Sequence, residues 1–151
     1  MDNKDVISTL NKLVETSRDG DKGFTNCAEE STDAALKAYF TICATRCRES
    51  VRTLDQAIRQ LGGSAETSGT IMGGANRAWL DLRVAIESNS DLAVLSECER
   101  AEDTALKNYL DALKQPLPND IYSLVQAQCD GVRMNHDRVR ALRDDKKRVT
   151  A

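Results

Sequence analysis

Apolar side chains recur at helical intervals along most of this chain, and that periodicity narrows its fold more than any other feature. The clearest stretch lies between residues 33 and 61, where the steps are three and four residues: Leu36, Tyr39, Phe40, Cys43, Cys47, Val51, Leu54, Ile58 and Leu61. Such spacing puts these side chains on one face of an α-helix. Only two prolines interrupt the chain, and no alternating strand pattern competes. We therefore predict an all-α fold.

Five helices are predicted, and the four longest form a bundle. Their ranges are 4–30, 33–61, 75–88, 91–114 and 119–143. Short links join the first long helix to the second and the third to the fourth, so each pair is expected to be an antiparallel hairpin. Gly62 and Gly63 end the second helix, and a long, partly helical crossover then connects the hairpins. Gly20 and Gly23 weaken the first helix and allow a break or bend there.

The length and composition fit one globular domain spanning residues 1–151. A chain of 151 residues with 40% hydrophobic and 30% charged residues can bury a core, and the 4% of aromatic residues predicts an aliphatic one. The net charge of -3 disfavours nucleic acid, and no apolar window approaches the ~20 residues of a bilayer span. The N-terminus lacks the pattern of a secretory signal, and five cysteines read as reduced thiols. We expect a cytoplasmic protein.

Polar residues and one glycine interrupt the predicted apolar stripes near the middle of the helices. These positions are Ser17, Gly20, Asp21, Glu99, Glu102, Gln128 and His136. Antiparallel pairing of the first hairpin brings Ser17, Gly20 and Asp21 near Cys43 and Cys47. In the second hairpin Glu99 falls near His136, and Glu102 falls near Gln128 and Val132. A buried carboxylate must find a partner or take up a proton, so these groups are expected to interact.

Three interpretations of this polar set remain open. It is a structural polar network, or a metal site between facing helices, or a small-ligand cavity where Ser17 and Gly20 leave space. The metal ligands would be Glu99, Glu102 and His136, with Asp19, Asp21, Cys43 and Cys47 as further candidates. Cys43 and Cys47 share a helix face, but free cysteines also pack as small core residues. The cofactor would be none, or iron or another divalent metal.

Several segments together resemble a known family. They are VISTLNKL at 6–13 with Asp19-Gly20, LGG at 61–63, CERAED at 98–103 followed by Tyr109, and HDR at 136–138 followed by LRD at 142–144. In order and spacing these segments resemble a bacterial family of four-helix-bundle proteins that is classed only as a domain of unknown function, within the ferritin-like superfamily. The resemblance implies a ferritin-like four-helix bundle with a long crossover and leaves the function unassigned.

The chain departs from the metal ligands of ferritin-like di-iron proteins. Such proteins use a Glu from each of two helices and a Glu-x-x-His from each of the other two. The resemblance carries these ligands onto Glu102 and His136, and leaves only Asp19 or Asp21 for the first helix. The last Glu falls on Arg133, and one histidine in the whole chain cannot serve two such motifs. The resemblance therefore implies a degenerate site.

Two functional hypotheses follow from these observations. The leading one is a non-catalytic ferritin-like protein that acts by interaction, or in a stress-related role suggested only by the resemblance. The alternative is a metal-binding or redox protein with a non-standard site in the bundle core. We expect no nucleic-acid or membrane partner, while a homo-oligomer or a protein partner stays open. The basic residues of 138–148 are interpreted as a solvated helix end.

Overall fold

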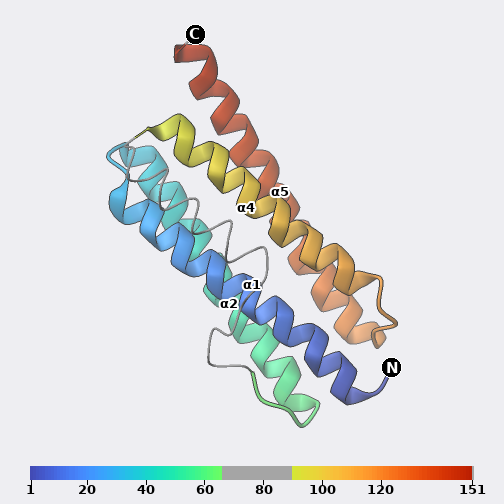
Figure 1. Ribbon diagram of the computed structural model, residues 1–151. Coiled ribbons are helices and arrows are strands. Elements are labelled where there is room, and N and C mark those ends of the chain that lie inside the picture. The colour runs from blue at the N-terminus through green and yellow to red at the C-terminus, as the bar shows by residue number, and fades with distance from the viewer. Residues whose placement is uncertain (66–89, 151) are drawn as a thin grey trace.

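The described residues form four α-helices without a β-strand. The computed structural model describes residues 1–65 and 90–150. Its helices are α1 (Asn3–Glu30), α2 (Ala34–Gln60), α4 (Asp91–Leu113) and α5 (Asn119–Thr150). Figure 1 shows α1 beside α2 and α4 beside α5, and the two hairpins lie together in an elongated bundle. The predicted all-α four-helix fold is confirmed. The helix predicted at 75–88 and most of the crossover lie outside the described residues.

Side-chain caps begin three of the helices. Asp2, Asp33 and Ser90 each accept a hydrogen bond from a backbone N–H group in the first turn of the helix that follows. At the other end of α2, Gly62 adopts a positive φ of 88°. The N–H of Gly63 then donates to the carbonyl of Ile58 over 3.0 Å, which closes the helix as a Schellman turn. The predicted end of this helix at the two glycines is confirmed.

Two helices differ from the prediction. α1 runs unbroken through Gly20 and Gly23, so the break that these glycines allow is absent. α5 continues to Thr150 rather than ending at 143. Ion pairs from its last turns to other helices account for the difference. Arg143 contacts Glu99, and Lys146 lies 3.4 Å from carboxylates of both Asp33 and Asp91.

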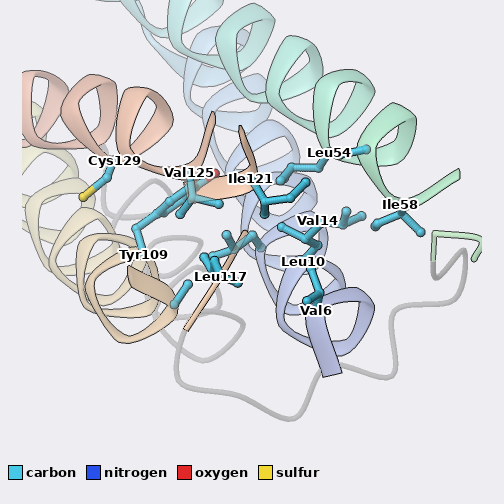
Figure 2. Packing of buried hydrophobic residues seen from close by; sticks show 13 residues of the cluster. Val6, Leu10, Val14, Leu54, Ile58, Tyr109, Leu117, Ile121, Val125 and Cys129 are labelled. Carbon is cyan, nitrogen blue, oxygen red and sulfur yellow. The ribbon is translucent and has the colours of Figure 1, made fainter. Parts of the chain in front are cut away.

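The described residues form two apolar core clusters, one toward each end of the bundle. Figure 2 shows the first, in which Leu10 and Val14 of α1 lie close to Leu54 of α2 and Ile121 of α5. The second contains Phe24, Phe40, Leu95, Cys98 and Val139. The core is mainly aliphatic, as predicted. Among the described helices, none combines the length and the apolar character needed to span a bilayer.

Candidate metal centre

One group of ligand-type side chains lies between α4 and α5. Glu99 and Asp103 are four residues apart on α4 and therefore share a face of that helix. His136 of α5 faces them, with its Nε2 2.5 Å from Oδ1 of Asp103 and 3.9 Å from Oε1 of Glu99. One potential ligand atom from each of the three residues lies within 4.8 Å of the others. Two carboxylates and an imidazole thus converge on one small volume.

The imidazole of His136 is buried at this point. The residue is only 5% exposed. Its Nε2 is buried and makes no hydrogen bond, and its close neighbour is the carboxylate of Asp103. The other ring nitrogen, Nδ1, lies 3.3 Å from Oδ1 of Asp137. Asp103 keeps 60% of its side chain exposed. The group is therefore closed on the bundle side and open to solvent on the Asp103 side.

Two guanidinium groups hold Glu99 in place. Nε of Arg140 donates to Oε1 of Glu99 over 3.1 Å, and Nη1 of Arg143 donates to Oε2. Arg143 also donates to Asp144. A carboxylate offers about four lone-pair directions, so Glu99 retains acceptor capacity toward His136. The two arginines nevertheless compete with a cation for this carboxylate.

Glu102, a predicted ligand, lies apart from this group. It points into the centre of the bundle, where Nδ2 of Asn135 donates to its Oε1 over 3.0 Å. Burial raises the pKa of Glu102 to about 8, partly offset by this hydrogen bond. Oδ1 of Asn135 accepts hydrogen bonds from the hydroxyl of Tyr39 and, over 3.2 Å, from the thiol of Cys43. At neutral pH the Glu102 carboxyl is therefore mainly protonated, within a hydrogen-bonded set.

A cavity of about 80 Å³ lies in the centre of the bundle and is lined by all four helices. Its wall includes Ser17 and Gly20, the two residues beside which a cavity was expected. Glu102 and Gln128 also line it, and Glu102 is the one carboxylate among its described lining residues. A di-iron centre requires several charged carboxylates. A single, mainly neutral carboxyl among thiols and amides does not fit such a centre.

The remaining predicted ligands are dispersed. Asp21 pairs with Arg48 over 2.8 Å. Asp19 lines a surface groove of about 800 Å³ between α1 and α4; its Oδ2 has no hydrogen-bond partner, and burial raises its pKa to about 6. Cys43 and Cys47 line the central cavity, and burial raises the pKa of both thiols. In the described part of the chain, Glu99, Asp103 and His136 are the one group suited to a metal ion.

Asp103 is the member of this group that the sequence reasoning missed. Asp103 lies beside the apolar stripe and is exposed, so it does not interrupt the stripe as Glu99 and His136 do. The signal that could have found it is its position four residues after Glu99, which puts both carboxylates on one helix face. Glu102, three residues after Glu99, turns toward the bundle centre instead.

The chain matches a known family model over most of its length. A family model described as a domain of unknown function (DUF2383) matches residues 5–115, which is more than half of the chain. The matched region contains all but the first two residues of α1, together with α2 and α4 with Glu99 and Asp103, and it ends before α5 and His136. A search of curated proteins found no match to the chain.

Proposed function

The chain belongs to the family described as a domain of unknown function (DUF2383), and we propose that it is a helical-bundle protein that binds one divalent metal ion between α4 and α5. The ligands are Glu99, Asp103 and His136. The main observation behind this proposal is that Nε2 of His136 is buried, makes no hydrogen bond and faces both carboxylates. One imidazole with two carboxylates is a donor set suited to Mn²⁺, Fe²⁺ or Zn²⁺.

The surroundings of the three ligands support a bound cation. Asp137 lies against Nδ1 of His136, and a carboxylate in that position orients the ring of a metal-binding histidine. The ion pairs that are linked to His136 contain four carboxylates but only two guanidinium groups. The carboxylates are those of Glu99, Asp103, Asp137 and Asp144, and the guanidinium groups are those of Arg140 and Arg143. This excess of negative charge favours a cation, although solvent weakens the contribution of the three exposed Asp side chains.

The ferritin-like relationship is part of the same proposal. Two antiparallel helical hairpins support it, as do the positions of Glu102 and His136 on two of the ligands that the resemblance implies. The metal ion proposed here differs from a di-iron centre in position, because it lies between the helices of one hairpin. The central cavity would then be the remnant of an ancestral site.

A second candidate is a non-catalytic bundle that acts through its surface and uses the same cluster as an ion-pair network. The two arginines on Glu99 favour this candidate, since the negative charge of a carboxylate with two guanidinium partners is already compensated. In that case the two ring nitrogens of His136 are held by their close contacts with Asp103 and Asp137. The two functions predict different metal contents for the purified protein.

Metal loading tests the proposal. Protein stripped with a chelator is incubated separately with Mn²⁺, anaerobic Fe²⁺ and Zn²⁺, desalted, and analysed for bound metal and thermal unfolding. We expect one equivalent of at least one metal, with a stabilisation of about 3 kcal/mol at a hundredfold excess over the dissociation constant. Folded protein that stays free of all three metals would contradict the proposal and favour the ion-pair network.

Two variants on one helix locate the site. Asp103→Asn removes an exposed ligand without leaving a buried charge, and we expect at least a tenfold weaker metal affinity. Asp111→Asn is the matched control, because Asp111 lies two turns later on α4 and pairs with lysines. Glu102→Gln should also retain metal. Loss of metal in Glu102→Gln with retention in Asp103→Asn would place the ion in the central cavity instead.

A further inference from the structure

Two buried cysteines from different hairpins face each other. Cys27 lies near the end of α1, and Cys98 lies in the second turn of α4. Their sulfur atoms are 3.8 Å apart, and the residues are 1% and 0% exposed. The two residues belong to the apolar cluster that contains Phe24, Leu95 and Val139. This contact joins positions 71 residues apart in the sequence.

We propose that Cys27 and Cys98 form an oxidation site, at which a hydroperoxide converts the two thiols into a disulfide that links α1 to α4. In the first step the sulfur of Cys27 attacks the hydroperoxide; an S–O bond forms, the O–O bond breaks, and an alcohol or water leaves with the thiol proton. In the second step the sulfur of Cys98 attacks the sulfenic acid; the S–S bond forms, the S–O bond breaks, and water leaves.

The two sulfur atoms have a short distance to cover. A disulfide bond is about 2.0 Å long, so the sulfur atoms have to approach each other by about 1.8 Å from their present separation. The two sulfur atoms are already in contact across the interface between α1 and α4, so the bond can form once the two side chains and helices make up this difference. Cys43 and Cys47 differ, since both lie on α2 and a bond between them would link no two helices.

Access to the pair is through the end of the bundle. A cavity of about 10 Å³, close to the volume that one water molecule requires, is lined by Cys27 together with Ser31 at the end of α1 and Ser90 and Asp91 at the start of α4. A hydroperoxide molecule therefore reaches Cys27 when these two helix ends separate slightly. We expect the oxidation to be slower than that of a surface thiol, because its rate includes this local opening.

Peptide mapping of the whole protein tests the inference without any substitution. The metal-free, reduced protein is treated with hydrogen peroxide, unreacted thiols are alkylated, and the protein is digested with trypsin. Each of the five cysteines lies in its own tryptic peptide. We expect the peptide of residues 23–37 to be linked to that of residues 84–100, the free thiols to fall from five to three, and the melting temperature to rise until a reductant is added.

Variants separate this pair from the other thiols. Cys27→Ala and Cys98→Ala should each abolish the linked peptide, while Cys129→Ala, the matched control at a buried cysteine of α5, should retain it. A link between the peptides of Cys43 and Cys47, a link only between chains, or five thiols that remain free after prolonged treatment would each overturn the inference. The mapping on unaltered protein gives this answer even if an alanine variant does not fold.

Discussion

The carboxyl group of Glu102 lies at the centre of the bundle, where the residue is 5% exposed. Burial raises its pKa from 4.5 to about 8. Between these two values the native chain binds more protons at this residue than the unfolded chain does. The contribution of Glu102 to stability is therefore fully present below about pH 4.5 and is lost as the pH rises through about 8.

Replacing this carboxyl by an amide should remove that pH dependence. Glu102→Gln keeps the side-chain shape and an oxygen that can accept from Asn135, but it cannot ionise. We expect the variant to be more stable than the parent by roughly 4 kcal/mol at about pH 8, and by less than about 1 kcal/mol near pH 5. Urea unfolding at several pH values measures the difference. Glu49→Gln, at an exposed site on α2, is the control and should show no such trend.

At the level of single residues, part of the candidate site was predictable from the sequence. Glu99 and His136 lie on facing helical stripes, so antiparallel pairing alone brought them together, and their proximity is now observed. The arginines were not predictable as partners of Glu99. Arg143 lies at the last residue of the predicted helix, and its contact depends on α5 continuing straight. The separation of Glu102 from the group depends on side-chain direction, which spacing alone does not determine.

At the level of the helices, α1 and α2 approach each other closely where α1 carries a glycine. A Cβ atom on Gly20 would lie 2.7 Å from the sulfur of Cys47. The glycine costs the helix about 1 kcal/mol relative to alanine, but it leaves room for the thiol. A Cβ atom on Gly131 of α5 would have no such neighbour, because nothing lies within 4 Å of its position. The two glycines therefore have different roles.

Alanine substitutions at these glycines should have opposite effects. Gly20→Ala is expected to destabilise the protein by about 1–2 kcal/mol, since Cys47 has to move. In a Cys47→Ala background the same change should stabilise it by up to about 1 kcal/mol, as Gly131→Ala should in the parent. Chemical denaturation of the four variants gives these values. An equal cost of Gly20→Ala in both backgrounds would show that the contact with Cys47 is not the cause.

The helices themselves were largely predictable because their signals are local. Apolar spacing gave the four long elements, and Asp33 and Gly62 marked their ends. The continuity of α1 through its glycines was less accessible from sequence, since packing against α2 overrides the weak helix propensity of Gly20 and Gly23. The extension of α5 depends on long-range ion pairs such as that between Lys146 and Asp33. Neither effect is present in a local sequence window.

At the level of the whole molecule, a hydrogen-bonded path crosses the centre of the bundle. The hydroxyl of Tyr109 on α4 lies 3.2 Å from Oγ of Ser17 on α1 and donates to Gln128 on α5 over 2.8 Å. Gln128 in turn donates to the backbone carbonyl of Ser50 on α2 over 3.4 Å. All four described helices are therefore connected through this one hydroxyl and its partners.

Removing that hydroxyl should weaken the assembly of the two hairpins. Tyr109→Phe retains the ring but leaves Ser17 and Gln128 without this partner, and we expect a loss of about 1–3 kcal/mol in the free energy of unfolding. Tyr122→Phe is the control, because Tyr122 is 42% exposed and its change should fall within about 0.5 kcal/mol. Thermal and urea unfolding measure both. Equal stability of the two variants would mean that water replaces the Tyr109 hydroxyl at no cost.

Asn135 has a consequence for how the chain chooses among alternative helix packings. Its amide is hydrogen-bonded to Tyr39, Cys43 and Glu102 at the same time. These three hydrogen bonds can form together at only one axial position of α5. Sliding α5 by a single turn, about 5.4 Å, would bring Gly131 or Val139 to that place and leave a buried carboxyl facing no amide. Aliphatic side chains tolerate such slippage much better than this group does. The polar centre therefore excludes slipped bundles that the apolar ends alone would accept.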